Sequence, residues 1–471
     1  MAEMLKRQYD LVVLKVTLDT TSEEPQVRFE IEVKIGDEVQ SVAQWQFAAG
    51  ALGVPDRIDR RRALHRGYDF QIPPDLLEGL KHWLEQESTA DTPLWLHLVK
   101  PYGYLCMVPW ERLLQPILGV PLLRLPDFIV HAPRETPRAL DVLLCSSGPL
   151  AKEQFRISEH LVMLAQRLSK AVPRRTRFHI FADAAISGEL HKSFQNAGMT
   201  EEVVTVYGPE SAAPYAIPEA TTRVADKISG LENPWLLWMR DSLHGSSVDV
   251  AHFVCHGYLS HDRGALAFAE SPLKNSDTRM SRFVGAAELK TFLTQIGAWA
   301  TVFSSPEFNY SQMGLRQLAD SIAQSRPGPV VHHDLEMDPE AATLGEAYRL
   351  LFSRKPERPP ASPAVFIYCQ PFRVLAPSED GVRAISEPQM VEPSELDSVY
   401  DTADNVPAWI AASERYVEER ELRLRKLRRE PGRETPNAMR QRTSETLEST
   451  LKEIRAVVAR IAATTRSGSG Q

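Results

Sequence analysis

Two apolar stretches of the sequence each end in residues that could carry out acid–base chemistry. The first, "VDVAHFVCHG", ends in His256 and Gly257, and the second, "WATVFSSPEF", contains Ser304 and Ser305. A neutral imidazole can take a proton from a nearby nucleophile and return it to a leaving amine. A glycine after it leaves a backbone N–H open to hold the oxyanion of a tetrahedral intermediate. Taken alone, the motif more often marks a histidine that caps a strand in a loop.

The segments that must position these residues alternate between apolar runs and amphipathic helical patterns. The apolar runs are "DVLLCSS", "RFHIFAD", "EVVTVYG", "DVAHFVCH", "WATVFSS", "GPVVHHD" and "AVFIYCQ". This alternation predicts an α/β fold with a mainly parallel sheet covered by helices on both faces. Reactive groups gather at the carboxyl ends of such strands. We therefore expect His256 and Ser305 at two strand ends that face a common cleft.

The chain before this region predicts a small α+β domain over residues 1–130. It contains the strand-like runs "LVVLKVTL" and "VRFEIEVKI" and the helical segment "PPDLLEGLKHWLEQES". The stretch "HAPRETPRAL" at 131–140 has the composition of a linker.

The chain after residue 375 turns to Pro, Glu and Ser. Residues 385–466 predict a helical extension with a seam for packing within the chain or against a partner helix. The seam is formed by Leu447, Leu451, Ile454, Val458 and Ile461. A basic run lies in the same extension, where interleaved glutamates favour a solvated helix or a protein-docking face over nucleic-acid binding. The run consists of Arg420, Arg423, Arg425, Lys426, Arg428 and Arg429.

The composition narrows the class of protein. The 471 residues are 43% hydrophobic and 25% charged with a net charge of -8, which fits a globular chain and argues against nucleic acid as the main partner. No apolar run reaches the roughly 18–20 residues that cross a bilayer, and no signal peptide is evident. Four scattered cysteines without a CxxC motif predict reduced thiols in a cytoplasm, without a metal site. No cofactor is expected, since no phosphate-binding glycine loop is present.

Several motifs together resemble a CHAT domain, a prokaryote-rich branch of the caspase and separase clan of cysteine peptidases. The motifs are "VDVAHFVCHGYL", "SRFVGAAEL" and "ATVFSSPEF…GLRQLADSI…GPVVHHDLEMDPEAA", with "PWERLL" at 109–114 similar to the segment that often precedes CHAT domains. The resemblance covers roughly residues 137–375. It implies a caspase-like three-layer sandwich, with the histidine after one central strand and the cysteine after the next.

The sequence departs from this family at the nucleophile. Ser305 stands at the usual cysteine position, or Ser304 if the alignment slips by one residue. The resemblance implies His256 as general base and acid, with the amides of Gly257 and residue 305 holding the oxyanion. A serine nucleophile needs a tightly bound base that a third group orients, and the sequence offers no clear carboxylate for that role. We expect little or no cleavage by this chain, whether the serine is natural or replaces a cysteine.

Acidic residues follow the next strand, where the family's substrate-pocket loop would begin. Asp334, Glu336 and Asp338 could select a basic side chain before the scissile bond, although a solvated acidic loop is the more common meaning of such a cluster. His332 and His333 are interpreted as loop residues beside the cleft.

Two residues near His256 have simpler interpretations. Cys255 should face the core, because strand neighbours point to opposite faces. His252 lies about 13 Å from His256 along a strand, too far to share a metal ion.

The favoured function is therefore a cytoplasmic CHAT-type cysteine endopeptidase that acts on protein substrates and is inactive with serine at position 305. The resemblance implies a role in bacterial antiviral defence or programmed death, with a sensor or an upstream protease as activator. The alternative is a non-catalytic CHAT-like scaffold that binds partner proteins. A nucleotide-binding protein is a third, weaker interpretation.

Overall fold

The computed structural model describes most of the chain up to residue 375. The described residues are 6, 9–21, 24–35, 38–55, 68–87, 92–126, 139–148, 157–183, 186–216, 226–227, 230–260, 263–273, 281–306, 309–326, 328–353, 357–371 and 374–375. The predicted helical extension at 385–466, with its apolar seam and its basic run, lies outside these residues.

The strands between residues 139 and 368 form the mainly parallel sheet that the sequence predicts. They are β6 (Ala139–Ser147), β7 (Arg175–Phe181), β8 (Val204–Val206), β9 (Val250–Ser260), β12 (Ala300–Ser305), β13 (Val330–Asp334) and β14 (Val365–Tyr368). Their order is β14-β13-β12-β9-β6-β7-β8, and all neighbours are parallel except β13 and β14. The apolar runs quoted above are thus confirmed as strands.

A hairpin that the sequence patterns did not predict lies between β9 and β12. It consists of β10 (Arg263–Ala269) and β11 (Ser281–Gly285). β10 is antiparallel to both β9 and β11. Its pairing with β9 begins at His256 and extends β9 to Ser260, well beyond Val254, where the pairing of β9 with β12 ends.

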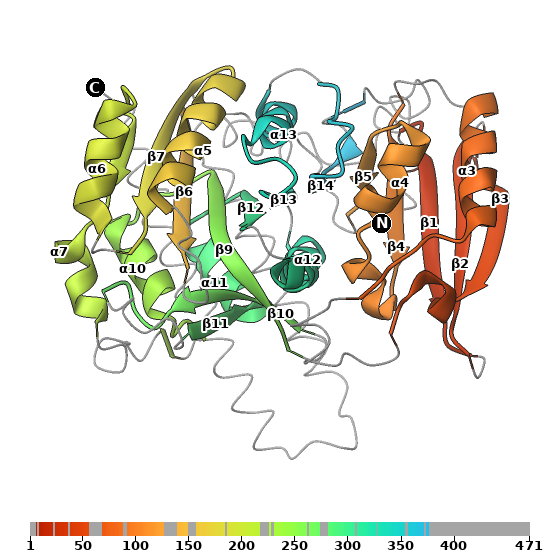
Figure 1. Cartoon of the computed structure of the whole chain (residues 1–471), viewed down its shortest axis with the longest axis horizontal. Helices are drawn as coiled ribbons and strands as arrows, with labels where there is room; N and C mark the ends of the chain where they lie inside the picture. The colour runs from red at the N-terminus through yellow and green to blue at the C-terminus, as the bar shows by residue number, and fades with distance from the viewer. Residues whose placement is uncertain are drawn as a thin grey trace, which may run out of the picture.

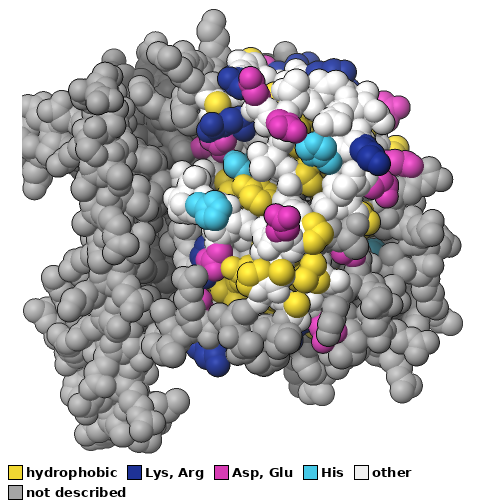
Figure 2. Space-filling view, turned by 90° about the vertical axis from the view of Figure 1, so that its left-hand side faces the viewer, with side chains coloured by type: hydrophobic (Ala, Val, Ile, Leu, Met, Phe, Trp, Pro, Cys, Tyr) yellow, Lys and Arg dark blue, Asp and Glu magenta, His cyan; other side chains and the backbone are white. Residues whose placement is uncertain are grey.

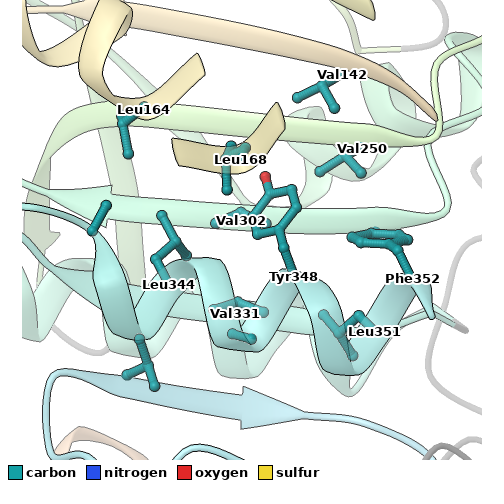
Figure 3. Close-up of a cluster of buried hydrophobic side chains, with 14 of the residues drawn as sticks. Val142, Leu164, Leu168, Val250, Val302, Val331, Leu344, Tyr348, Leu351 and Phe352 are labelled. Atoms are coloured by element: carbon teal, nitrogen blue, oxygen red, sulfur yellow. The ribbon is translucent and has the colours of Figure 1, made fainter. Parts of the chain in front are cut away.

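Helices cover both faces of this sheet. They are α5 (Ile157–Ala171), α6 (Ser187–Asn196), α7 (Pro209–Ala212), α10 (Pro234–Ser242), α11 (Ala286–Gln295), α12 (Asn309–Ala323) and α13 (Ala342–Phe352). Val250, Val302 and Val331 pack against α5 and α13, as Figure 3 shows. Phe253 and Phe303 pack in a second cluster with α10, α11 and α12. We call these two sides the α13 face and the α12 face; together they give the predicted α/β layers.

The N-terminal elements continue the same sheet. They are β1 (Val12–Asp19), β2 (Gln26–Ile35), β3 (Glu38–Ala48), α3 (Pro74–Glu87), β4 (Leu94–Val99), α4 (Trp110–Leu118) and β5 (Leu122–Arg124). The strand order β3-β2-β1-β4-β5 runs on into β14, with β3 and β7 near opposite ends of the molecule (Figure 1). The predicted domain at 1–130 is therefore joined to the rest by strand pairing between Arg124 and Tyr368.

A buried ion pair reinforces this junction. Arg124 donates to Oε1 of Glu111 at 2.7 Å and to Oε2 at 2.9 Å, and both residues are buried. The guanidinium carbon of Arg124 also lies 4.1 Å from the centre of the Phe366 ring on β14. The two hydrogen bonds to Glu111 and the contact with the aromatic ring offset the free-energy cost of removing the guanidinium from water.

The surface gives two further constraints. Among the described helices, none combines the length and the apolar character needed to cross a bilayer. The end of the molecule that carries α6 and α7 mixes basic, acidic and apolar side chains in its described part (Figure 2). The described part of this end therefore carries both signs of charge.

The junction leads to a stability prediction. Glu111→Ala should lower the free energy of unfolding by about 3–5 kcal/mol, because it leaves the buried guanidinium of Arg124 without its anion. Urea unfolding of the full chain would measure the change. Glu202→Ala is the matched control, since the Arg175–Glu202 pair is exposed and should contribute at most about 1 kcal/mol. Equal losses in the two variants would contradict the role given to the junction.

Candidate functional site

His256 lies inside a strand rather than at its end. It pairs with Ala267 of β10, and Gly257 pairs with Leu266. The prediction that His256 lies at a strand end is therefore wrong, because pairing with β10 extends β9 beyond this residue. His256 is 1% exposed, and burial lowers its pKa to about 4, so the imidazole is neutral at neutral pH.

Ser305 ends β12 as expected, but it is buried. Its exposed fraction is 0%, and its hydroxyl donates to the carbonyl oxygen of Pro306 at 3.2 Å. In the register of β12 and β13, Ser305 pairs with Asp334. We call position 305, where the family has its cysteine, the nucleophile slot. It thus lies next to Asp334, the first residue of the predicted acidic cluster.

Strand alternation separates the two predicted partners. The strands β9 and β12 are adjacent and parallel, with Val254 paired to Ser304. Side chains alternate along a strand, so His256 faces the α13 side together with Ser304. Ser305 faces the α12 side together with Phe303. His256 and Ser305 therefore leave the sheet toward opposite faces.

A chain of five polar side chains occupies the α13 face instead. The hydroxyl oxygen of Tyr348 lies 3.0 Å from Nδ1 of His252, whose Nε2 lies 2.8 Å from Oγ of Ser304. The same Oγ lies 3.0 Å from Nδ1 of His333. Nε2 of His333 lies 3.3 Å from Oδ2 of Asp338. We call these five residues the buried relay; the first four are 0% exposed.

Asp338 fixes the charge at one end of the buried relay. Burial by itself would raise the pKa of this carboxyl. Contact with His333 and hydrogen bonds from the amides of Leu344 and Ala342 outweigh burial and hold the pKa below its usual value. Asp338 is therefore an anion that can only accept hydrogen bonds at neutral pH.

One proton arrangement fits the hydrogen bonds from Tyr348 to His333. The contact of 3.3 Å with the carboxylate of Asp338 favours a proton on Nε2 of His333, although this nitrogen makes no hydrogen bond of good geometry. Nδ1 of His333 is then free to accept from the hydroxyl of Ser304. Oγ of Ser304 accepts from Nε2 of His252, and Nδ1 of His252 accepts from Tyr348. His252 is neutral in this scheme. Burial first, and the neighbouring His333 second, lower the pKa of His252 to about 3, in agreement with a neutral ring.

The buried relay contains the residue types of a serine hydrolase triad in Ser304, His333 and Asp338. Its hydroxyl is fully buried and is held by two imidazoles, so no substrate carbonyl can approach it in this conformation. The arrangement is structural, because its hydrogen bonds link β9, β12, β13 and α13. The sequence reasoning missed it, although His252, Ser304 and His333 lie on the same side of three neighbouring strands by alternation.

The expectation that His332 and His333 are loop residues is wrong. Both belong to β13, which is paired on one side with β12 and on the other with β14, and both are buried. The His332 ring stacks on Phe366 with centroids 4.9 Å apart, and burial lowers its pKa well below the usual value.

The predicted acidic cluster does not form a solvated loop as a group. Asp334 is buried and accepts from Nε2 of Gln312 at 2.6 Å and from the amide of Glu336 at 3.0 Å. Asp338 is held in the buried relay and at the start of α13. Glu336 is the exposed member. Selection of a basic side chain by these residues stays a prediction.

The cysteines behave as buried thiols. Cys255 packs in the cluster of the α12 face, on the opposite side from His256, as predicted. All four cysteines of the chain are free and buried. Burial raises the pKa of Cys106 and of Cys145 well above the usual value, which makes both poor nucleophiles.

Comparison with known proteins adds no identification. The chain matches no protein-family model, and it matches no curated protein sequence.

Ser304 and Ser305 form a matched pair for testing the buried relay. Ser304→Ala removes the hydroxyl that bridges two buried imidazoles, so it should lower the free energy of unfolding by about 1–3 kcal/mol. Ser305→Ala removes a hydroxyl bonded only to a neighbouring carbonyl and should cost less. Urea unfolding of both variants measures the difference. A larger loss for Ser305→Ala would show that the relay is not a stabilising network.

The buried histidines also predict the pH dependence of stability. The folded pKa values of His252 and His256 are about 3 and about 4, below the unfolded value of roughly 6.5. The unfolded chain therefore binds protons first as the pH falls, and stability is full above pH about 6.5 and drops below it. The loss should reach a few kcal/mol by about pH 4.5.

Unfolding free energies measured from pH 7.5 to 4.5 would check this dependence. His252→Asn should flatten the slope, because it removes one of the groups that takes up a proton on unfolding. A stability that stays constant over this range in the original chain would contradict the assignment of neutral, buried imidazoles.

Proposed function

We propose that this chain is a CHAT-like protein of caspase-like architecture that binds partner proteins without cleaving them. The observation that carries the proposal is the burial of every candidate nucleophile in the described part of the site. Ser305 is 0% exposed, and all four cysteines are buried. A nucleophile has to come within about 3–3.5 Å of the scissile carbonyl, which a buried group cannot do.

The hydrogen bonds of the two serines support the same conclusion. A serine nucleophile passes its proton to an imidazole in the step of attack. The hydroxyl of Ser305 donates to a carbonyl, and that of Ser304 is enclosed between two histidines. Neither hydroxyl combines a proton acceptor with access for a substrate.

The competing proposal is a CHAT-type cysteine endopeptidase that acts on protein substrates and has lost its thiol. It is supported by the adjacent, parallel strands β9 and β12 and by the neutral imidazole of His256, which is the protonation state a base needs. In this proposal Gly257 and the amide of residue 305 would hold the oxyanion. A cysteine at position 305 would be required for turnover.

The biological setting that we propose rests on the resemblance and on the thiols. A sensor or an upstream protease would control the protein within a bacterial antiviral defence or cell-death system. Four free cysteines in one chain support a reducing compartment such as the cytoplasm.

One substitution separates the two proposals. Ser305→Cys places a thiol in the slot with almost no change in volume. We expect the original chain, Ser305→Cys and Ser305→Cys/His256→Ala all to leave a pooled fluorogenic peptide library uncleaved, because position 305 faces away from His256 and is buried. Fluorescence release, with mass spectrometry of a denatured protein substrate, measures cleavage.

Cleavage by Ser305→Cys that disappears in the double variant would overturn the non-catalytic proposal in favour of a latent peptidase. Cleavage by the original chain that Ser305→Ala abolishes would overturn both, since it would make the serine itself a working nucleophile. Circular dichroism of each variant confirms that the fold is retained.

A further inference from the structure

A stripe of buried polar side chains runs along α12 on the face that covers Ser305. Gln312, Arg316 and Asp320 are spaced four residues apart and so lie on one side of the helix. All three are buried. Gln312 donates to Asp334, and Asp320 accepts hydrogen bonds from two tyrosine hydroxyls. The two ends of the stripe are therefore satisfied.

Arg316, in the middle of the stripe, does not have hydrogen-bond partners for all of its N–H groups. It is 8% exposed, and it donates through one terminal nitrogen to Oε1 of Gln312 at 3.2 Å. Its Nε has no hydrogen-bond partner, and among the described residues it forms no ion pair with a carboxylate. A guanidinium carries five N–H donors, and burying it without an anion is costly.

Glu111 and Asp334 are close enough to attract the guanidinium of Arg316 electrostatically, but both carboxylates accept hydrogen bonds from other groups. Glu111 uses both of its oxygens for Arg124, and Asp334 accepts from Gln312 and from a backbone amide. A second open nitrogen lies in the same region, because Nε2 of His332 is buried without a partner. Burial is the main cause of the lowered pKa of His332, and the positive charge of Arg316 is the second. The two groups are therefore near one another.

The guanidinium of Arg316 is connected to Ser305 through hydrogen bonds and strand pairing. Asp334 pairs with Ser305 in the strand register, and Gln312 links Asp334 to Arg316. Of the residues connected in this way, Arg316 is the one with an unfilled charge requirement. Carboxylates match the fork of N–H donors on a guanidinium, and low polarity around the group strengthens the attraction.

We propose that Arg316 binds a carboxylate supplied by an acidic side chain of a partner protein. This inference rests on the proposed binding function and names the chemistry of the partner at that same site. The partner group proposed here is negatively charged, whereas the sequence suggested that Asp334, Glu336 and Asp338 select a positively charged side chain. A buried guanidinium without a hydrogen-bonded carboxylate lowers stability, which is the pattern of a residue kept for binding rather than for folding.

Thermal unfolding of the full chain with three added probes tests the proposal. The probes are N-acetylglutamate methylamide, its neutral glutamine counterpart and acetate. We expect Tm to rise with the concentration of the blocked glutamate, less with acetate, and not with the glutamine compound at matched ionic strength. Arg316→Met should abolish the response without lowering Tm, because it removes a buried charge that lacks an anion.

Arg326→Met is the matched control. Burial also lowers the pKa of Arg326 to about 10, but this arginine donates to the carbonyl of Ala298 and lies 3.4 Å from the hydroxyl of Thr301. Its replacement should lower Tm and leave the response to the blocked glutamate intact. A merely structural Arg316 would behave like Arg326 in this comparison.

The outcomes are separable. No response of the original chain, or an equal response in Arg316→Met, overturns the proposal. A response to acetate that equals the response to the blocked glutamate assigns a free small anion and overturns the partner side chain. Peptide cleavage by Ser305→Cys would overturn the non-catalytic function while leaving the Arg316 response as it is.

Discussion

The parallel pairing of β12 with β9 on one side and β13 on the other is the constraint on which the site depends. It fixes Ser304 beside Val254 and His333, and Ser305 beside Asp334. Because the side-chain period of a strand is two, each of these neighbours is committed to one face of the sheet. A shift of one residue would exchange the two serines and break both polar clusters at once.

The two faces use buried polar groups in different ways. On the α13 face, hydrogen bonds link Tyr348, His252, Ser304 and His333, and an ion-pair contact continues to Asp338. Such a network adds rigidity and specifies the packing. On the α12 face, the stripe of Gln312, Arg316 and Asp320 connects the slot to the N-terminal strands, through tyrosines of which one, Tyr368, also contacts Arg124. In this stripe the guanidinium of Arg316 has no hydrogen-bonded carboxylate among the described residues, and the binding proposed above rests on this difference between the two faces.

The sequence predicted the sheet well because its strands are continuous apolar runs, which a two-sided parallel sheet requires. It missed β10 and β11, whose pairing partners are set by tertiary context rather than by a local pattern, and this displaced His256 from the expected strand end. The rule of alternation that correctly placed Cys255 in the core also applies to His256 and Ser305. The paired contacts of the buried relay needed the strand register, which no single segment encodes.

The helix α12 lies very close to β9 and β10. A Cβ atom added to Gly314 would lie 2.6 Å from the backbone of Tyr258, and one added to Gly264 would lie 2.0 Å from the carbonyl oxygen of Gly314. These contacts are possible because both residues are glycines. They hold α12 against β9 and β10 on the face of the sheet toward which Ser305 points. The burial of Ser305 opposes catalysis, whereas Arg316, which the proposed carboxylate has to reach, retains an exposed fraction of 8%.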